Sequence, residues 1–145
     1  MRVIAGKYKG RRLEAPQDSA VRPTTDKVKE AMFSMLSEEI WESSVLDLFS
    51  GTGALGIEAL SRGAKRCVFG DSSRDSLRLI KSNIEHCKAW EGAELAAGDF
   101  KKTLMKQEKP YRDQRQKAEH HRGRTSHQIQ EGCESHNVFR RKFHR

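Results

Sequence analysis

Short apolar runs recur along the chain and predict buried strands. Residues 45–49 form the strongest run, residues 67–69 a second, and residues 93–97 a weaker third. Runs of this length, bounded by Gly, Ser or charged positions, are typical of strands that neighbouring layers cover on both faces. We therefore expect three strands.

Helical spacing fills the intervals between these runs. Residues 54–62 predict a helix that ends before Gly63, and Ser73 is the expected cap of a second helix. The second helix places Leu77, Ile80 and Ile84 on one face. Strands that alternate with helices in this order predict an α/β fold, the first half of a parallel, doubly wound sheet.

The first forty residues predict a hairpin followed by a helix. Strands are expected at residues 2–5 and 11–14, joined by a turn that contains two glycines. Thr24 or Thr25 would cap the helix, which should end near Ile40 or Trp41. The apolar positions at helical spacing, which we expect to face the core, are Val28, Ala31, Met32, Met35 and Leu36.

The apolar pattern nearly disappears after Met105, and no period of 2 or 3.6 residues continues beyond it. A segment of that composition buries too little apolar area to offset its ordering entropy. We therefore expect three parts: residues 1–42 as a hairpin and helix, residues 43–105 as an α/β unit, and residues 106–145 as an unstructured basic tail.

Composition narrows the setting. The chain has 145 residues, 35% of them hydrophobic, and a formal charge of +8 that suggests an anionic partner. There is no apolar run long enough to span a membrane and no export signal at the start, so we expect a cytoplasmic protein and no membrane partner. The spacings of its three cysteines and six histidines fit neither a disulfide framework nor a metal site.

The strongest chemical signal is the glycine loop Asp47-Leu48-Phe49-Ser50-Gly51-Thr52-Gly53. It follows a predicted strand and opens a helix, and its glycines allow close approach to a ligand. With Gly56 the loop also fits the dinucleotide fingerprint. Asp47 favours S-adenosyl-L-methionine instead, because a carboxylate there suits the cationic aminoacyl group and would repel a pyrophosphate.

Two further positions fit the same cofactor. Asp71, after the second strand, would accept hydrogen bonds from both ribose hydroxyls, although helix capping is an alternative role. Asp99 and Phe100 follow the third strand and would lie near the adenine, although a plain turn explains them about as well. The predicted cofactor-binding set is Asp47, Phe49, Gly51, Gly53, Asp71, Asp99 and Phe100.

Three sequence blocks up to about Met105 together resemble the RsmD family of 16S ribosomal RNA guanine-N2 methyltransferases. The blocks are RVIAG with KGRRL, RPTTD with VKEA, and DLF through GIEALSRGA. The resemblance implies a Rossmann-like fold and methyl transfer from S-adenosyl-L-methionine to a guanine exocyclic amine in the small ribosomal subunit. It also implies an RNA-docking role for residues 1–42 and the cofactor-binding half of a methyltransferase domain for residues 43–105. We expect a monomer.

The family motif Asp-Pro-Pro-Tyr or Asn-Pro-Pro-Tyr, which the resemblance implies for the target amine, does not occur in this sequence. The three prolines are Pro16, Pro23 and Pro110, and no two are adjacent. We therefore assign no catalytic residue and expect an inactive chain. The abrupt loss of pattern near Met105 leads us to expect a truncated protein with a shifted reading frame beyond that point.

A basic cluster near the start is the expected RNA contact. Lys9, Arg11, Arg12 and Arg22 would lie toward one side of the cofactor site if the hairpin forms. Ordinary surface charge is the competing explanation. The alternative functions that stay open are a noncatalytic basic RNA-binding fragment, a nonfunctional gene product and, less favoured, an NAD-binding protein.

Overall fold

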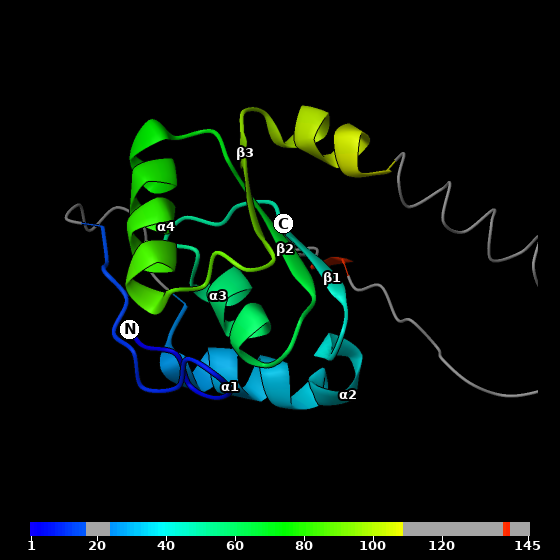
Figure 1. Cartoon of the computed structure of the whole chain (residues 1–145). Coiled ribbons are helices and arrows are strands. Elements are labelled where there is room, and N and C mark those ends of the chain that lie inside the picture. The colour runs from blue at the N-terminus through cyan, green and yellow to red at the C-terminus, as the bar shows by residue number, and fades with distance from the viewer. Residues whose placement is uncertain (17–23, 109–137, 140–145) are drawn as a thin grey trace, which may run out of the picture.

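A parallel sheet forms the centre of the molecule (Figure 1). The computed structural model describes residues 1–16, 24–108 and 138–139. The strand order is β3-β2-β1-β4, and every neighbouring pair is parallel. The strands are β1 (Ser44–Asp47), β2 (Arg66–Asp71), β3 (Ala93–Ala97) and β4 (Val138–Phe139).

Helices follow the strands as the hydrophobic pattern predicts. They are α1 (Asp26–Met35), α2 (Ser37–Ile40), α3 (Ala54–Ser61), α4 (Arg74–Cys87) and an unlabelled helix over residues 100–108, drawn in yellow in Figure 1. The predicted α/β order is thus confirmed, with β3 at its predicted bounds. Two expected caps also form: Thr25 Oγ1 accepts from the Val28 amide, and Ser73 Oγ accepts from the Ser76 amide.

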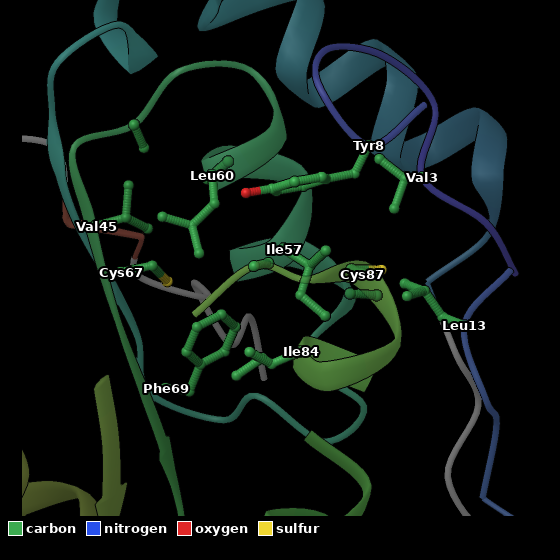
Figure 2. Close-up of a cluster of buried hydrophobic side chains, with 14 of the residues drawn as sticks. Val3, Tyr8, Leu13, Val45, Ile57, Leu60, Cys67, Phe69, Ile84 and Cys87 are labelled. Atoms are coloured by element: carbon green, nitrogen blue, oxygen red, sulfur yellow. The ribbon is translucent and has the colours of Figure 1, made fainter. Parts of the chain in front are cut away.

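Alternation along β1 and β2 divides the core between the two faces of the sheet. Val45, Cys67 and Phe69 belong to the large cluster on the face that α3 and α4 cover (Figure 2). Leu46 and Val68 point to the other face, where Leu104 of the helix over residues 100–108 packs against them. The sheet is therefore covered on both sides, as parallel sheets are.

The N-terminal segment, residues 1–16, belongs to the main core and is not a separate appendage. Its ends meet in one antiparallel bridge, Arg2 with Arg12, instead of the two predicted strands. Val3, Tyr8 and Leu13 are buried in the cluster that also contains Ile57 and Leu60 of α3 (Figure 2). The expected boundary at residue 42 therefore does not separate two cores.

The orientation of α1 differs from the predicted one. Lys29 and Phe33 are completely buried, whereas Val28 and Met35 are 56% and 79% exposed. The apolar stripe predicted from spacing therefore faces partly outward. The physical reason is that Lys29 finds an anionic partner inside the fold, so a charged residue occupies a core position that periodicity assigns to apolar residues.

Two parts of the predicted unstructured tail have regular structure. Residues 106–108 continue the helix that starts at residue 100, and β4 pairs with β1 in the register Leu46 to Val138 and Asp47 to Phe139. The rest of that predicted segment lies outside the described residues. Among the residues that the structure describes, no helix is long and apolar enough to cross a membrane.

Candidate cofactor site

The predicted cofactor residues lie after the carboxyl ends of β1, β2 and β3. These strands are parallel neighbours, with Asp47 beside Phe69 and Asp71 beside Ala97 in the register. Their carboxyl ends therefore share one edge of the sheet, the edge at which open α/β sheets bind ligands. The structure thus brings to one edge three segments whose predicted residues run from Asp47 to Phe100 in the sequence.

Hydrogen bonds within the glycine loop, and one to β2, fix the loop after β1. Ser50 Oγ donates to the Asp47 carbonyl at 2.8 Å, and the Ser50 amide donates to the Gly70 carbonyl at 3.1 Å. The Gly53 amide returns to the Ser50 carbonyl at 2.7 Å. Gly51 and Gly53 have φ angles of 57° and 76°, in the left-handed region that favours glycine.

Asp71 is bonded directly to this loop. Its Oδ2 accepts from the Gly51 amide at 3.0 Å, and its Oδ1 accepts from the Ser73 amide at 2.9 Å. The carboxylate is half-buried, so it also faces solvent. The Gly51 contact joins the glycine loop to the end of β2 across twenty residues. The Ser73 contact lies at the start of α4, so Asp71 also has a structural role there.

Asp47 is the buried carboxylate of the site, with 6% of its surface exposed. Its charge acts on Cys67, one strand away: burial is the main reason that the pKa of the Cys67 thiol lies well above its usual value, and the Asp47 carboxylate raises it further. The end of β1 therefore has the negative potential that a bound cation would require.

Two aromatic rings meet beside the loop. The centroids of Phe49 and Phe100 are 5.4 Å apart with an interplanar angle of 44°, and the two side chains are 50% and 39% exposed. Asp99 Oδ1 accepts from the Lys101 amide at 2.7 Å, and the Asp99 carbonyl accepts from Thr103. Asp99 therefore starts a helix here instead of a plain turn.

The predicted basic cluster contains both exposed side chains and one that is hydrogen-bonded to α4. Lys9 and Arg12 are exposed. Arg11 instead donates to the carbonyls of His86 and Cys87 at the end of α4 and lies 5.4 Å over the Tyr8 ring. Arg22 lies outside the described residues. The reason for the difference is that a helix C-terminus offers unpaired carbonyls and negative potential to a nearby cation.

A buried ion cluster attaches the N-terminal segment to α3, and spacing arguments missed it. Glu58, fully buried, accepts from the Ile4 amide at 2.8 Å, the Ala5 amide at 3.1 Å and Arg62 Nε at 2.8 Å. Lys29 Nζ lies 3.3 Å from the same carboxylate and donates to the Arg2 carbonyl. The signal in the sequence is Glu58, which is the one charged residue of α3.

Gly6 shows how closely the segment approaches α3. A Cβ at Gly6 would lie 1.7 Å from the Ser61 carbonyl oxygen, and the φ angle of Gly6 is 81°. The Lys7 amide donates to that same carbonyl at 2.7 Å, and Ser61 Oγ accepts from the Tyr8 amide at 2.9 Å. Only glycine permits this contact between the first block and α3.

Metal-binding clusters of three or more His, Cys, Asp or Glu do not occur among the described residues. Cys67 and Cys87 are free thiols, and burial raises the pKa of both. Cys133 lies outside the described residues.

Comparison with known proteins decides the family. The family model described as conserved hypothetical protein 95 matches residues 1–116. The chain belongs to this family. The match runs past Met105, where the resemblance was expected to end, so the conserved hypothetical protein 95 pattern includes a further segment that local periodicity does not reveal.

Two named proteins have sequences similar to this chain. YlbH of Bacillus subtilis is 39% identical over 130 residues, which cover 81% of this chain and 71% of YlbH. Ribosomal RNA small subunit methyltransferase D of Escherichia coli is 39% identical over 89 residues, 61% of this chain and 45% of the relative. The chain thus spans less than half of that enzyme's length.

A solved structure confirms the fold. The Escherichia coli protein yhhF matches with a TM-score of 0.64 and 36% identity over 72% of this chain and 56% of its own. The conserved hypothetical protein 95 match covers both the N-terminal segment and strands β1 to β3, the two parts that Glu58 and Gly6 join into one core.

Proposed function

We propose that the described part of this chain binds S-adenosyl-L-methionine and belongs to a methyltransferase for small-subunit ribosomal RNA. The observation that carries the proposal is the 3.0 Å hydrogen bond from the Gly51 amide to the Asp71 carboxylate. It supports the proposal because the carboxylate that we propose as the ribose ligand lies against the glycine loop. A relative that carries the name ribosomal RNA small subunit methyltransferase D supports the substrate class.

The residues at the sheet edge fit this cofactor chemically. Asp47 would face the ammonium group, Asp71 the ribose hydroxyls, and Asp99 the adenine amino group. Phe49 and Phe100 would contact the adenine ring. A Cβ built at Gly51 meets no atom within 4 Å, so the loop has open space on the side where a ligand would approach.

When bound, the cofactor supplies an electrophilic methyl group, and the acceptor we propose is a guanine exocyclic amine of 16S ribosomal RNA. The exposed Lys9 and Arg12 would contact RNA phosphates. Arg11 is unsuited to this role because its guanidinium is bonded to α4. We propose a cytoplasmic location, because ribosomal RNA would be the substrate there.

The sequence lacks the proline pair that the family resemblance implies for holding the target amine. We therefore propose cofactor binding without methyl transfer by this chain, because an unpositioned acceptor receives little transition-state stabilisation. Incubation of the chain with small-subunit particles and labelled cofactor should leave the RNA unmethylated. Labelled guanine at the turnover of a typical methyltransferase would contradict this.

Calorimetry with S-adenosylhomocysteine tests the cofactor proposal. Asp47→Asn should weaken binding at least about tenfold, since a hydrogen bond to a charged group contributes roughly 1.5–3 kcal/mol. Asp75→Asn is the matched control: Asp75 forms an exposed ion pair with Arg78, so its loss should leave affinity unchanged. Tight binding of NAD, or equal affinity in the Asp47 variant, would support the dinucleotide alternative instead.

A further inference from the structure

Asn83 is a polar residue on the apolar face of α4. It is completely buried, as are Ile80 and Ile84 on the same face. Its amide oxygen accepts from the Glu14 amide at 2.8 Å, and its Nδ2 donates to the Glu14 carbonyl at 3.1 Å and to the Thr52 carbonyl at 2.9 Å. Both Nδ2 hydrogens and the oxygen are therefore used, which fixes the orientation of the amide.

The two partners of Asn83 belong to different parts of the site. Thr52 lies inside the glycine loop, between Gly51 and Gly53. Glu14 lies near the end of the N-terminal segment, which carries Lys9 and Arg12. One buried side chain thus joins the main chain of the proposed cofactor loop to the main chain of the proposed RNA-contacting segment.

We infer that Asn83 is a positioning residue that holds the glycine loop in its ligand-binding conformation. The same side chain couples this conformation to the packing of the N-terminal segment against α4. The inference rests on the proposed function. A buried carbonyl needs a donor, and the Asn83 side chain supplies one to the carbonyl of Thr52. Loosening either side of the link changes the other, because coupling between two sites is reciprocal.

The substitution Asn83→Asp keeps nearly the same side-chain shape and makes the hydrogen-bond donor depend on protonation. A carboxylate at this position would face the carbonyls of Thr52 and Glu14 without a hydrogen to donate, whereas a protonated carboxyl can donate to Thr52 as the amide does. Burial among carbonyls favours the protonated form as the pH falls. Affinity for S-adenosylhomocysteine should therefore be reduced about tenfold or more at pH 8 and largely restored at pH 5.

The controls use neighbours of the same link. Ser82→Ala removes the 3.1 Å hydrogen bond from Ser82 to the exposed Glu14 carboxylate and leaves Asn83 in place, so its affinity should match that of the unaltered chain. Glu14, Asp47 and Asp71 are the other carboxylates around this link and are present in every variant. Each affinity is therefore compared with that of the unaltered chain at the same pH.

Amide hydrogen exchange provides a second measurement on the unaltered full chain. Addition of S-adenosylhomocysteine should slow exchange at the Glu14 amide, which donates to Asn83, as well as in the loop. Equal affinity of Asn83→Asp and the unaltered chain at pH 8, or no change at the Glu14 amide on binding, would overturn the coupling while cofactor binding stands. Absence of binding by the unaltered chain would instead overturn the proposed function and the coupling together.

Discussion

Replacement of Lys29 by Met tests whether the buried ion cluster determines the stability of the fold. Lys29 is fully buried, and its ammonium lies between the Glu58 carboxylate, at 3.3 Å, and the Arg2 carbonyl. Methionine preserves most of the stem and removes the charge. The buried Glu58 carboxylate then keeps its desolvation cost but loses the attraction of the Lys29 ammonium, so the folded state is destabilised.

The expected cost is about 3 kcal/mol, the lower end of the range for a broken buried pair. The lower end applies because Glu58 keeps Arg62 and the amides of Ile4 and Ala5. Glu58→Gln should cost more, about 4–5 kcal/mol, since it removes the negative charge that compensates the buried Lys29 ammonium. The double variant should cost less than the sum of the two, with a coupling energy on the order of 1–3 kcal/mol.

Urea unfolding followed by tryptophan fluorescence measures these free energies of unfolding, provided that the slope of the free energy against urea concentration is the same in all variants. Lys27→Met is the matched control, because Lys27 is exposed on the same helix and its loss should change stability by less than about 0.5 kcal/mol. A cost below about 1 kcal/mol for Lys29→Met, or additive single costs, would refute the reasoning that the charges are mutually dependent.

Three further predictions concern the N-terminal segment and the core. Gly10→Ala should cost about 1 kcal/mol for its left-handed backbone alone, whereas Gly6→Ala adds a clash with the main chain of α3 and should cost roughly 2–4 kcal/mol in urea unfolding; equal costs would contradict the close approach. Arg12→Gln should weaken RNA binding and lower its salt dependence, as measured by filter binding, because Arg12 is exposed. Arg11→Gln should instead lower the melting temperature measured by calorimetry, because Arg11 is bonded to α4, and the reverse pattern would contradict both assignments. Burial, reinforced by the Asp47 carboxylate, raises the pKa of the Cys67 thiol well above 9.0, so the protonated thiol contributes its full stability below about pH 9 and less as the pH rises further. Rapid alkylation of Cys67 in the folded chain at pH 8, measured by mass spectrometry, would contradict a protonated buried thiol.

The sequence by itself determined the elements whose signals are local. The alternation of apolar runs and helical spacing gave the strands and helices from β1 to β3, and Ser73 gave the start of α4, because capping and periodicity act over a few residues. It also predicted that the glycine loop and Asp71 would share a site, because parallel strands place their carboxyl ends at one edge of a sheet.

Only the tertiary structure decided the positions whose partners lie far away in the chain. Periodicity assigned Val28 and Met35 to the core and gave no reason to bury Lys29, since Glu58, which makes its burial tolerable, is 29 positions later in the sequence. Tyr8 likewise enters the core only because Gly6 lets the backbone touch α3. Burial of a charge depends on a partner brought by folding, and no local pattern of hydrophobicity carries that information.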